Sequence, residues 1–425
     1  MKAHSPVHPL THLASLFLLA SLLLIPAQAI AWSGGGTADN PYIIATSADL
    51  ARLAADVNGG DSCGGKYFKL TADIDLGGVS GDASTYWTPI GTLVSPDIRL
   101  FSGRFDGAGH EIKGLHIEAA SADYQGLFGA IGTTSSGDIA EVRSLTVRGS
   151  VAGRSTVGLI AGLNVGKITS CAASGAVSGT GEYTGGIVGM NFGAVSSSVS
   201  RSAVSGINDV GGIVGINYGA VTSSVSHSTV RGMGACVGGI VGMNNAAGSA
   251  TVSNCVSHGA VSGTGQSVGG IVGMNYDTVT NCASFSPVSG DSMNVGGIVG
   301  LSSGTITNCA LECSSVNGWS YATGAIAGYN YDGGTVQNCG WLKDANHGSG
   351  TDKHIGGGGG TVTDVISYDV TGKVAVTCLP EPSRLEVKTG ETGTIALVTY
   401  PAANRAANIA SASASVTPSD IASAA

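Results

Sequence analysis

The pentapeptide Gly-Gly-Ile-Val-Gly recurs along the chain at a nearly constant interval. Five copies begin at Gly185, Gly211, Gly238, Gly269 and Gly296. Two weaker copies, GLIAG from Gly158 and GAIAG from Gly324, precede and follow them. Successive copies start 26 to 31 residues apart, most often 27. Self-similarity at this length predicts one supersecondary unit that stacks on itself, so the repeat constrains the fold before any other feature does.

The residues between the copies favour short strands. Branched residues alternate with Ser, Thr and Asn, and glycine interrupts the pattern every few residues. Alternation of period two is typical of strands, whereas a helix needs a 3.6-residue period and few glycines. Two or three strands with their turns would use up one repeat, which makes it one coil. We therefore expect an all-β parallel β-helix or β-solenoid of about 27-residue coils, with equivalent positions about 4.8 Å apart.

Stacking accounts for the residues that recur at each repeat. The Ile-Val pair would pile into a dry core, and glycine would permit the close approach needed at corners. An Asn after each pair could bond to its copies in the neighbouring coils and form a ladder. The recurring Asn residues are Asn164, Asn191, Asn217, Asn244, Asn275 and Asn330, with Ser302 as the exception.

The two ends of the chain differ from the repeats. Residues 1–31 have the features of a signal peptide: Lys2 in a polar lead, an apolar run from Leu13 to Ile25, and small residues around Ala29. That run is shorter than the roughly 20 residues that span a bilayer. We therefore expect secretion, with no membrane insertion after signal cleavage.

A helix is expected between Thr46 and Gly60. Thr46 and Asp49 have capping-box spacing, and the apolar residues Leu50, Leu53, Ala54 and Val57 share one face. This face suits a cap on the first coil. Residues 32–125 are therefore interpreted as an N-terminal cap with the first coils, and residues 126–341 as the solenoid repeats.

The sequence beyond Trp341 loses the repeat register. Residues 342–379 are interpreted as a degenerate coil with a flexible glycine-rich linker at Gly348–Gly360 and a last hairpin or strand pair at Thr361–Cys378. Residues 380–425 differ in composition and are taken as a separate β segment. We expect Gly36–Trp341 to be one rigid body, and the linker and most of Ala402–Ala425 to be mobile.

The repeat unit, of the type GGIVGMNYGAVTSS, resembles the GLUG repeat of bacterial cell-surface proteins. The lead-in Gly36–Ala54, the segment KYFKLTADIDL and the segment FSGRFDGAGHEIKGL also resemble that family. The resemblance implies a secreted or surface β-solenoid of adhesin type, without catalytic residues. Leu385–Asn404 resembles a bacterial Ig-like domain of group 2, shorter than a complete one, so 380–425 would be a truncated Ig-like domain.

Charge and acidic residues argue against several functions. Net charge is −9 and Lys and Arg form no cluster in the sequence, which argues against nucleic acid as a partner. Cleavage of a polysaccharide needs converging carboxylates. The acids of the repeats fall at different repeat positions, so we do not expect stacking to bring them together. They are Glu182, Asp209, Asp277, Asp291, Glu312 and Asp332.

Four residues before the repeats are candidates for a catalytic or metal-binding role. Asp73 and Asp75 alternate on one strand, but further calcium ligands are lacking. Asp106 and His110 flank a glycine turn. The string from His110 lacks the second histidine of a zinc-protease HExxH motif. We expect turn or strand-edge roles for all four, and predict no catalytic residues, no metal, no cofactor and no enzyme activity.

The cysteines of the repeats share one position, where two copies have Ser198 and Ser224. They are Cys171, Cys255, Cys282, Cys309 and Cys339. Their spacing fits no zinc motif, and exchange with Ser indicates a requirement for a small residue. Strict alternation would place Cys309 opposite the Ile306 face unless a bulge intervenes. Stacked free thiols are the favoured interpretation, with disulfides between neighbouring coils as the alternative.

These observations predict a secreted or surface-exposed, non-catalytic β-solenoid, an adhesin that binds an extracellular glycan or protein ligand. One alternative is a structural stalk that displays another module. Another is a non-catalytic accessory region of a larger surface hydrolase.

Overall fold

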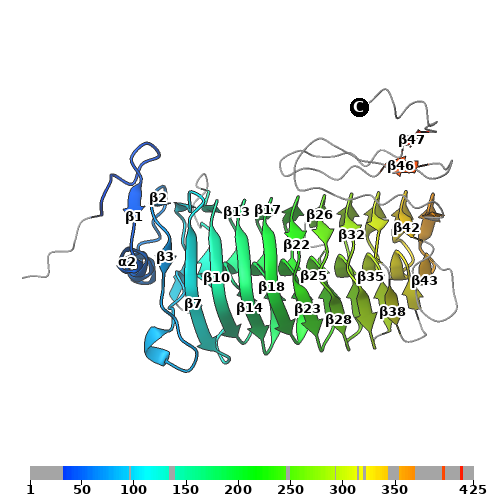
Figure 1. Ribbon diagram of the computed structural model, residues 1–425, viewed down its shortest axis with the longest axis horizontal. Coiled ribbons are helices and arrows are strands. Elements are labelled where there is room, and N and C mark those ends of the chain that lie inside the picture. Colours follow the sequence, from blue (N-terminus) through cyan, green and yellow to red (C-terminus); the bar gives the residue numbers. More distant parts are fainter. Residues whose placement is uncertain are drawn as a thin grey trace, which may run out of the picture.

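The computed structural model of the protein describes residues 32–94, 97–133, 139–245, 249–291, 293–313, 315–318, 322–342, 354–368, 395–397 and 412–414. The chain winds into a parallel β-solenoid whose coils follow one another along the long axis of the molecule (Figure 1). The expected fold class is confirmed. The signal segment 1–31 lies outside the described residues.

Each typical coil contributes to four sheets, whereas two or three strands were expected. Sheet A has the strand order β1 (Tyr42–Ile44), β2 (Tyr67–Leu70), β6 (Arg104–Asp106), β9 (Glu141–Arg143), β13 (Lys167–Thr169), β17 (Ala194–Ser196), β21 (Ala220–Thr222), β26 (Thr251–Ser253), β31 (Thr278–Thr280), β36 (Thr305–Thr307), β41 (Thr335–Gln337) and β44 (Thr361–Thr363).

Sheet B forms the broadest face, and its strands break in two from β22 onward. It contains β3 (Ile74–Asp75), β7 (Glu111–Ala119), β10 (Thr146–Gly153), β14 (Ala172–Gly179), β18 (Val199–Gly206), β22 (Val225–Ser226), β23 (Thr229–Gly232), β27 (Val256–Ser257), β28 (Val261–Gly263), β32 (Ala283–Ser284), β33 (Val288–Gly290), β37 (Ala310–Leu311), β38 (Val316–Gly318), β42 (Gly340–Leu342) and β45 (Ile366–Tyr368).

The other two long sheets carry the repeated pentapeptide. Sheet C contains β8 (Phe128–Ile131), β12 (Ala161–Asn164), β16 (Val188–Asn191), β20 (Val214–Asn217), β25 (Val241–Asn244), β30 (Val272–Asn275), β35 (Val299–Ser302), β40 (Ala327–Asn330) and β43 (Ile355–Gly357). Sheet D contains β11 (Val157–Gly158), β15 (Glu182–Gly185), β19 (Asn208–Gly211), β24 (Cys236–Gly238), β29 (Ser267–Gly269), β34 (Asn294–Gly296) and β39 (Ala322–Gly324).

The pentapeptide is the corner between sheets D and C. Its first glycine ends a strand of sheet D, as Gly185 ends β15, and its valine begins a strand of sheet C, as Val188 begins β16. Ile187 and Val188 are both fully buried, as are their copies in the next coils. The last glycine brings the two sheets together, because a Cβ on Gly273 would stand 2.5 Å from the backbone nitrogen of Val237. The packing of one sheet on the other therefore leaves room only for glycine at this position.

The expected asparagine ladder is confirmed. The Nδ2 atom of each Asn donates to the Oδ1 atom of its copy in the next coil, at 2.7 to 2.9 Å from Asn164 to Asn275. Asn275 ends the series by donating to Oγ of Ser302 at 3.2 Å. These side chains are fully buried, so each amide needs the partner that the next coil supplies.

Residues in the left-handed backbone conformation determine on which side of the strand the cysteine side chains lie. The residue before each cysteine of the repeat position has φ between +51° and +55°. Such a residue shifts the alternation by one, and all five thiols lie in the core. Each Sγ donates to the carbonyl two residues earlier at 3.2 to 3.4 Å. Ser198 and Ser224 make the same bond at 2.8 and 3.0 Å. The position therefore needs a small hydrogen-bond donor, and these thiols are free.

The helix α2 (Ser47–Asn58) lies at the first coil, at the blue end of the molecule in Figure 1. Thr46 caps it with the expected capping box, and Gly59 follows its last residue. Leu50, Leu53 and Val57 are buried in the same core cluster as the first strands. A short 3-10 helix, η2 (Ala83–Thr85), and a hairpin of β4 (Thr92–Val94) and β5 (Asp97–Arg99) complete the N-terminal part.

The prediction of a flexible linker at Gly348–Gly360 is wrong for the residues of this segment that the structure describes. Ile355–Gly357 form β43, which pairs in parallel with β40, so the glycine run belongs to a further coil. β44 and β45 likewise pair with β41 and β42, and not with each other as a hairpin would. Small residues fit here because a Cβ on Gly356 would meet the backbone of Ala322 at 2.5 Å. Residues 343–353 lie outside the described residues.

Of the tail 380–425, the structure describes one antiparallel pair, β46 (Ile395–Leu397) with β47 (Ala412–Ala414). The truncated Ig-like domain, and the mobility expected for Ala402–Ala425, stay predictions, since most of these residues lie outside the described part.

Candidate functional site

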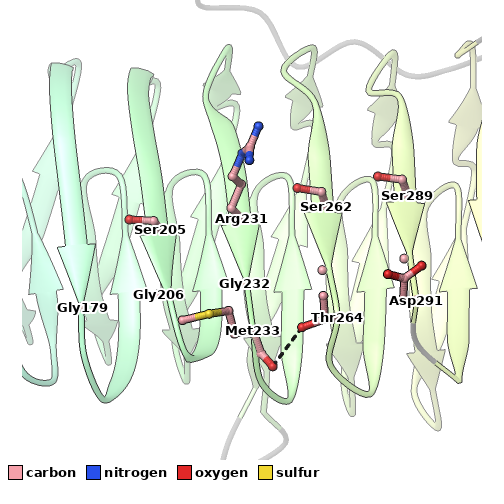
Figure 2. A pocket seen from close by; sticks show the side chains of 12 residues that line it. Gly179, Ser205, Gly206, Arg231, Gly232, Met233, Ser262, Thr264, Ser289 and Asp291 are labelled. Carbon is pink, nitrogen blue, oxygen red and sulfur yellow. Dashed lines mark hydrogen bonds between the residues drawn. The ribbon is translucent and has the colours of Figure 1, made fainter.

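A groove of about 490 Å³ runs along the outer face of sheet B, across the strands (Figure 2). A glycine from each of five coils lies along it: Gly179, Gly206, Gly232, Gly263 and Gly290. At four of them, Gly179, Gly206, Gly232 and Gly263, side chains of sheet D leave no room for a Cβ. A Cβ on Gly232, for example, would stand 2.3 Å from Cγ2 of Val237 in sheet D. The groove is thus a consequence of how sheet B covers sheet D.

Outward-facing residues on both sides of this glycine row line the groove. On one side, Ser205 pairs with Arg231, Arg231 with Ser262, and Ser262 with Ser289 in neighbouring strands. On the other side stand Met233, whose side chain is 69% exposed, Thr264 and Asp291. Thr264 is fixed by a hydrogen bond from its Oγ1 to the carbonyl of Met233 at 3.3 Å. At about 4.8 Å per coil, this surface is roughly 19 Å long and suits an extended chain more than a compact molecule.

Arg231 is the cation of this surface. It replaces the serine that its neighbours carry, and its guanidinium points away from Gly232 along the strand (Figure 2). Within the described part of the chain it makes no ion pair. The guanidinium therefore keeps its donors for solvent or a ligand.

The structure gives turn or strand-edge roles to the four candidate catalytic or metal-binding residues that precede the repeats in the sequence. Asp73 accepts hydrogen bonds from the backbone of Glu111 at 2.9 Å and from His110 at 3.1 Å. Asp75 accepts from the backbone of Gly77, and Asp106 from the backbone of Ala108. These bonds lower the pKa of Asp73 and of Asp75. Among the described residues no three His, Cys, Asp or Glu side chains gather as a metal site would require.

The acids of the repeats stay mostly apart. Asp277 accepts a hydrogen bond from the backbone of Ala250 at 3.0 Å, and Asp291 lines the groove. Glu182 and Asp209 are the exception, because they lie in neighbouring coils of sheet D and interact electrostatically. Here the expectation that stacking separates the acids is corrected: their repeat positions differ by only one residue.

Asp209 is the unusual titratable group of this pair. Its side chain is 6% exposed, and its Oδ1 atom has no hydrogen-bond partner among the described residues. Burial raises its pKa to about 6, a hydrogen bond with Cys236 opposes this, and Glu182 raises it further. Cys236 occupies the same position in the next coil and Ser267 in the one after. Asp209 is thus a carboxyl group where the next two coils carry small uncharged side chains.

We expect Asp209→Asn to stabilise the protein at high pH and not at low pH. A folded-state pKa of about 6, above the ordinary 3.8, means that the folded protein binds the proton more tightly. The contribution of the Asp209 carboxyl to the free energy of unfolding is complete below pH 3.8 and is lost as pH rises through about 6. Asn keeps the neutral form at every pH and tolerates the φ of +51°.

The measurement is urea unfolding of both proteins at about pH 4 and about pH 8. The gain from Asp209→Asn should be about 3 kcal/mol larger at the higher pH, at about 1.4 kcal/mol per pKa unit. Glu182→Gln, at an exposed neighbour, should give a much smaller difference. An equal gain at both values would show that Asp209 is ionised in the fold.

The sequence did not point to the groove residues. Arg231 and Asp291 looked like scattered charges because each occurs in a single repeat. Their shared surface follows from the register of sheet B, which aligns Ser205, Arg231, Ser262 and Ser289. A charged residue at a position where other repeats have serine was the available signal.

Comparison with known proteins gives partial relatives. No model of a known protein family matches the chain. Halomucin of Haloquadratum walsbyi is 31% identical over 158 residues, which are 36% of this chain and 2% of halomucin. A protein of Evansella cellulosilytica, provisionally named a Gly-rich membrane protein, is 35% identical over 107 residues, 25% of this chain and 11% of that protein. The matches therefore span a small part of the length of either relative.

A solved structure gives a further partial match. It is a protein of Bacteroides ovatus that is provisionally named an immunoglobulin A1 protease. The two share 23% sequence identity with a TM-score of 0.47, over 79% of this chain and 86% of the other.

In the part of the chain that the structure describes, no helix has the length and apolarity to cross a membrane.

Proposed function

We propose that this protein is a secreted or cell-surface β-solenoid that acts as an adhesin, without catalysis, by binding an extended glycan or protein chain in the groove of sheet B. The observation that carries the proposal is the groove itself, which crosses five coils and is lined by exposed side chains. A surface location is supported by the relative whose name describes a membrane protein.

A non-catalytic role is supported by the side chains of the groove. Asp291 is the carboxylate that lines it, whereas hydrolysis of a glycan uses a pair. The side-chain hydroxyls of Ser205 and Ser289 make no hydrogen bond within the described residues and can serve a ligand's hydroxyl or amide groups. Such a surface binds a chain by many weak contacts.

A binding array of glycans and matrix proteins, probed with the full chain, tests the proposal. We expect a ligand whose binding is lost when Ser262 and Ser289 are both replaced by Tyr, because two rings would fill the groove. Both serines face outward, so folding should be preserved. The matched control is the same pair of changes at Thr222 and Ser253 of sheet A, which should leave binding unchanged.

A structural stalk remains the second candidate, because every coil presents the same interface to the next. Removal of residues 238–295 deletes two whole repeats together with Ser262, Ser289 and Asp291. A stalk would fold and still display whatever follows it, and the adhesin would lose its ligand. Retained binding in this deletion, or lack of any ligand on the array, would favour the stalk.

A further inference from the structure

Past Arg154, the positive charge of the repeats lies mostly on sheet B. Between residues 155 and 342 the sequence has three Lys or Arg residues, Lys167, Arg201 and Arg231, and two histidines, His227 and His258. Arg201 lies in β18 and Arg231 in β23, which pair directly in sheet B. His227 and His258 follow β22 and β27 of the same sheet. Arg201, His227, Arg231 and His258 therefore lie on three consecutive coils of sheet B. We call these four residues the cationic surface.

The histidines extend the row that begins at Arg201. The backbone nitrogen of His227 donates to the carbonyl of Ser200, and that of His258 to the carbonyl of Ser226, so each lies one coil beyond the last. Their rings stack with centroids 4.8 Å apart and planes inclined by 8°. His258 stacks in turn on Phe285 at 4.9 Å. All three basic residues of the row, Arg201, His227 and His258, are exposed.

Among the described residues, neither arginine of the surface has an anionic partner. Ion pairs elsewhere in the described residues join Lys113 to Asp75 and Arg143 to Asp106, but none includes Arg201 or Arg231. At about 3.3 Å per residue and about 4.8 Å per coil, the Cα atoms of the two arginines are roughly 14 Å apart. Guanidinium groups bind carboxylates and sulfates through paired hydrogen bonds. Two unpaired arginines at this separation are suited to two anionic groups along one chain.

We propose that the cationic surface and the groove together bind an anionic polysaccharide, a glycan that carries carboxylates or sulfates along its chain. This rests on the proposed adhesin function and specifies its ligand. Arg231 belongs to both surfaces, because it lines the groove while its guanidinium extends along the strand (Figure 2). A glycan chain would lie in the groove, and its acidic groups would contact Arg231 and Arg201.

A nucleic acid or an anionic membrane fits less well. The chain has a net charge of −9, and binding to DNA draws on many phosphate contacts. The surface offers two permanent charges and two imidazoles. A polysaccharide with well-spaced acidic groups needs no more than this, and its hydroxyl groups match Ser205 and Ser289.

Binding should strengthen in mild acid. Partial burial of the stacked rings lowers the pKa of His227, with a further lowering by Arg201, and it lowers the pKa of His258, with a further lowering by His227. Both rings are therefore largely neutral at neutral pH, and an anion nearby favours their protonation. The nearest other charged groups on this face are Arg231, Asp291 in the groove, Glu312 one coil beyond Phe285, and Arg148 two coils before Arg201, where it is paired with Glu111.

The test titrates the full chain with polygalacturonate, dextran sulfate and neutral dextran at about pH 4.5 and about pH 7.5; the lower value lies well below the ordinary histidine pKa because the pKa of both rings is lowered. We expect binding of one or both charged polymers, stronger at the lower pH and weakened by salt. Replacing both Arg201 and Arg231 by Gln should lower the affinity about tenfold or more. Replacing both histidines by Gln should abolish the gain at low pH.

Lys167→Gln is the matched control, because it removes one positive charge from sheet A and should leave binding unchanged. Unfolding curves of all variants confirm that these exposed changes preserve the fold. Neutral dextran bound as tightly as the charged polymers, through a groove that Ser262→Tyr blocks, would overturn this inference and leave the adhesin proposal standing. Loss of binding with Lys167→Gln, or an equal affinity for single-stranded DNA, would also overturn it.

Discussion

Replacing Leu50 and Leu53 together by Asp should unravel the first coils while the later coils stay folded. Both leucines are fully buried in the cluster that joins α2 to the first strands. Two carboxylates there would lose their hydration without gaining partners, which costs several kcal/mol, in addition to the lost apolar burial. In a stacked repeat each coil contacts only its neighbours, so the damage should spread from the end inward and fade.

Hydrogen exchange measures this directly. We expect β2 and β6 to lose protection in the double variant, while β25 and β30 keep theirs. Ala51→Asp with Ala55→Asp is the control, because both alanines lie on the exposed face of the same helix. Unchanged protection of β2 in the leucine variant would mean that the helix does not cap the solenoid. Uniform loss over all coils would mean that the solenoid unfolds as one unit.

Replacing Gly273 by Ala should destabilise the middle of the solenoid by about 3 kcal/mol, at the upper end of what overpacking usually costs. A Cβ at this position would stand 2.5 Å from the backbone nitrogen of Val237 and 2.6 Å from the carbonyl oxygen of Gly242. Neither backbone atom can rotate away as the end of a side chain can. Sheets C and D would have to separate locally.

Urea unfolding, with hydrogen exchange at β24 and β30, would measure the effect. Gly333→Ala is the comparison, because that glycine has a φ of +92° but nothing within 4 Å of its Cβ position. It should cost about 1 kcal/mol, from backbone conformation alone. Equal costs at the two positions would show that the contact between sheets C and D is loose.

The elements that the sequence predicted correctly are those in which one residue type has one physical task. The capping box at Thr46 and Asp49 locates the start of a helix within a residue. The Asn at each coil predicted a ladder because a buried amide needs partners above and below it. Apolar pairs next to glycines predicted the core.

The features that could not be predicted depend on backbone conformations that reverse the alternation of sides. Asn308, with a φ of +53°, turns Cys309 into the core, although strict alternation placed it outside. Asn before four of the five cysteines was a usable signal, since Asn tolerates positive φ. The number of sheets was also missed, because the adjacent glycines of the pentapeptide look like one loop when they form a corner between two strands.

The candidate site could not be predicted from the sequence for a different reason. Arg201, Arg231, His227 and His258 occur at two repeat positions, and their proximity depends on which residues of each strand face outward. Sheet register supplies this information, and periodicity alone does not.

The corner between sheets C and A has a consequence for how such a gene can change length. From Asn244 to Thr251 the chain takes four residues more than from Asn217 to Ala220, yet β25 and β26 keep their register with both neighbours. Extra residues are thus accommodated at a corner without disturbing the coil. Recombination between repeats that adds or removes a whole coil would likewise join matching interfaces. Natural variants should therefore differ by whole coils or by corner insertions, and a coil inserted between β18 and β23 would separate Arg201 from Arg231 while leaving the fold intact.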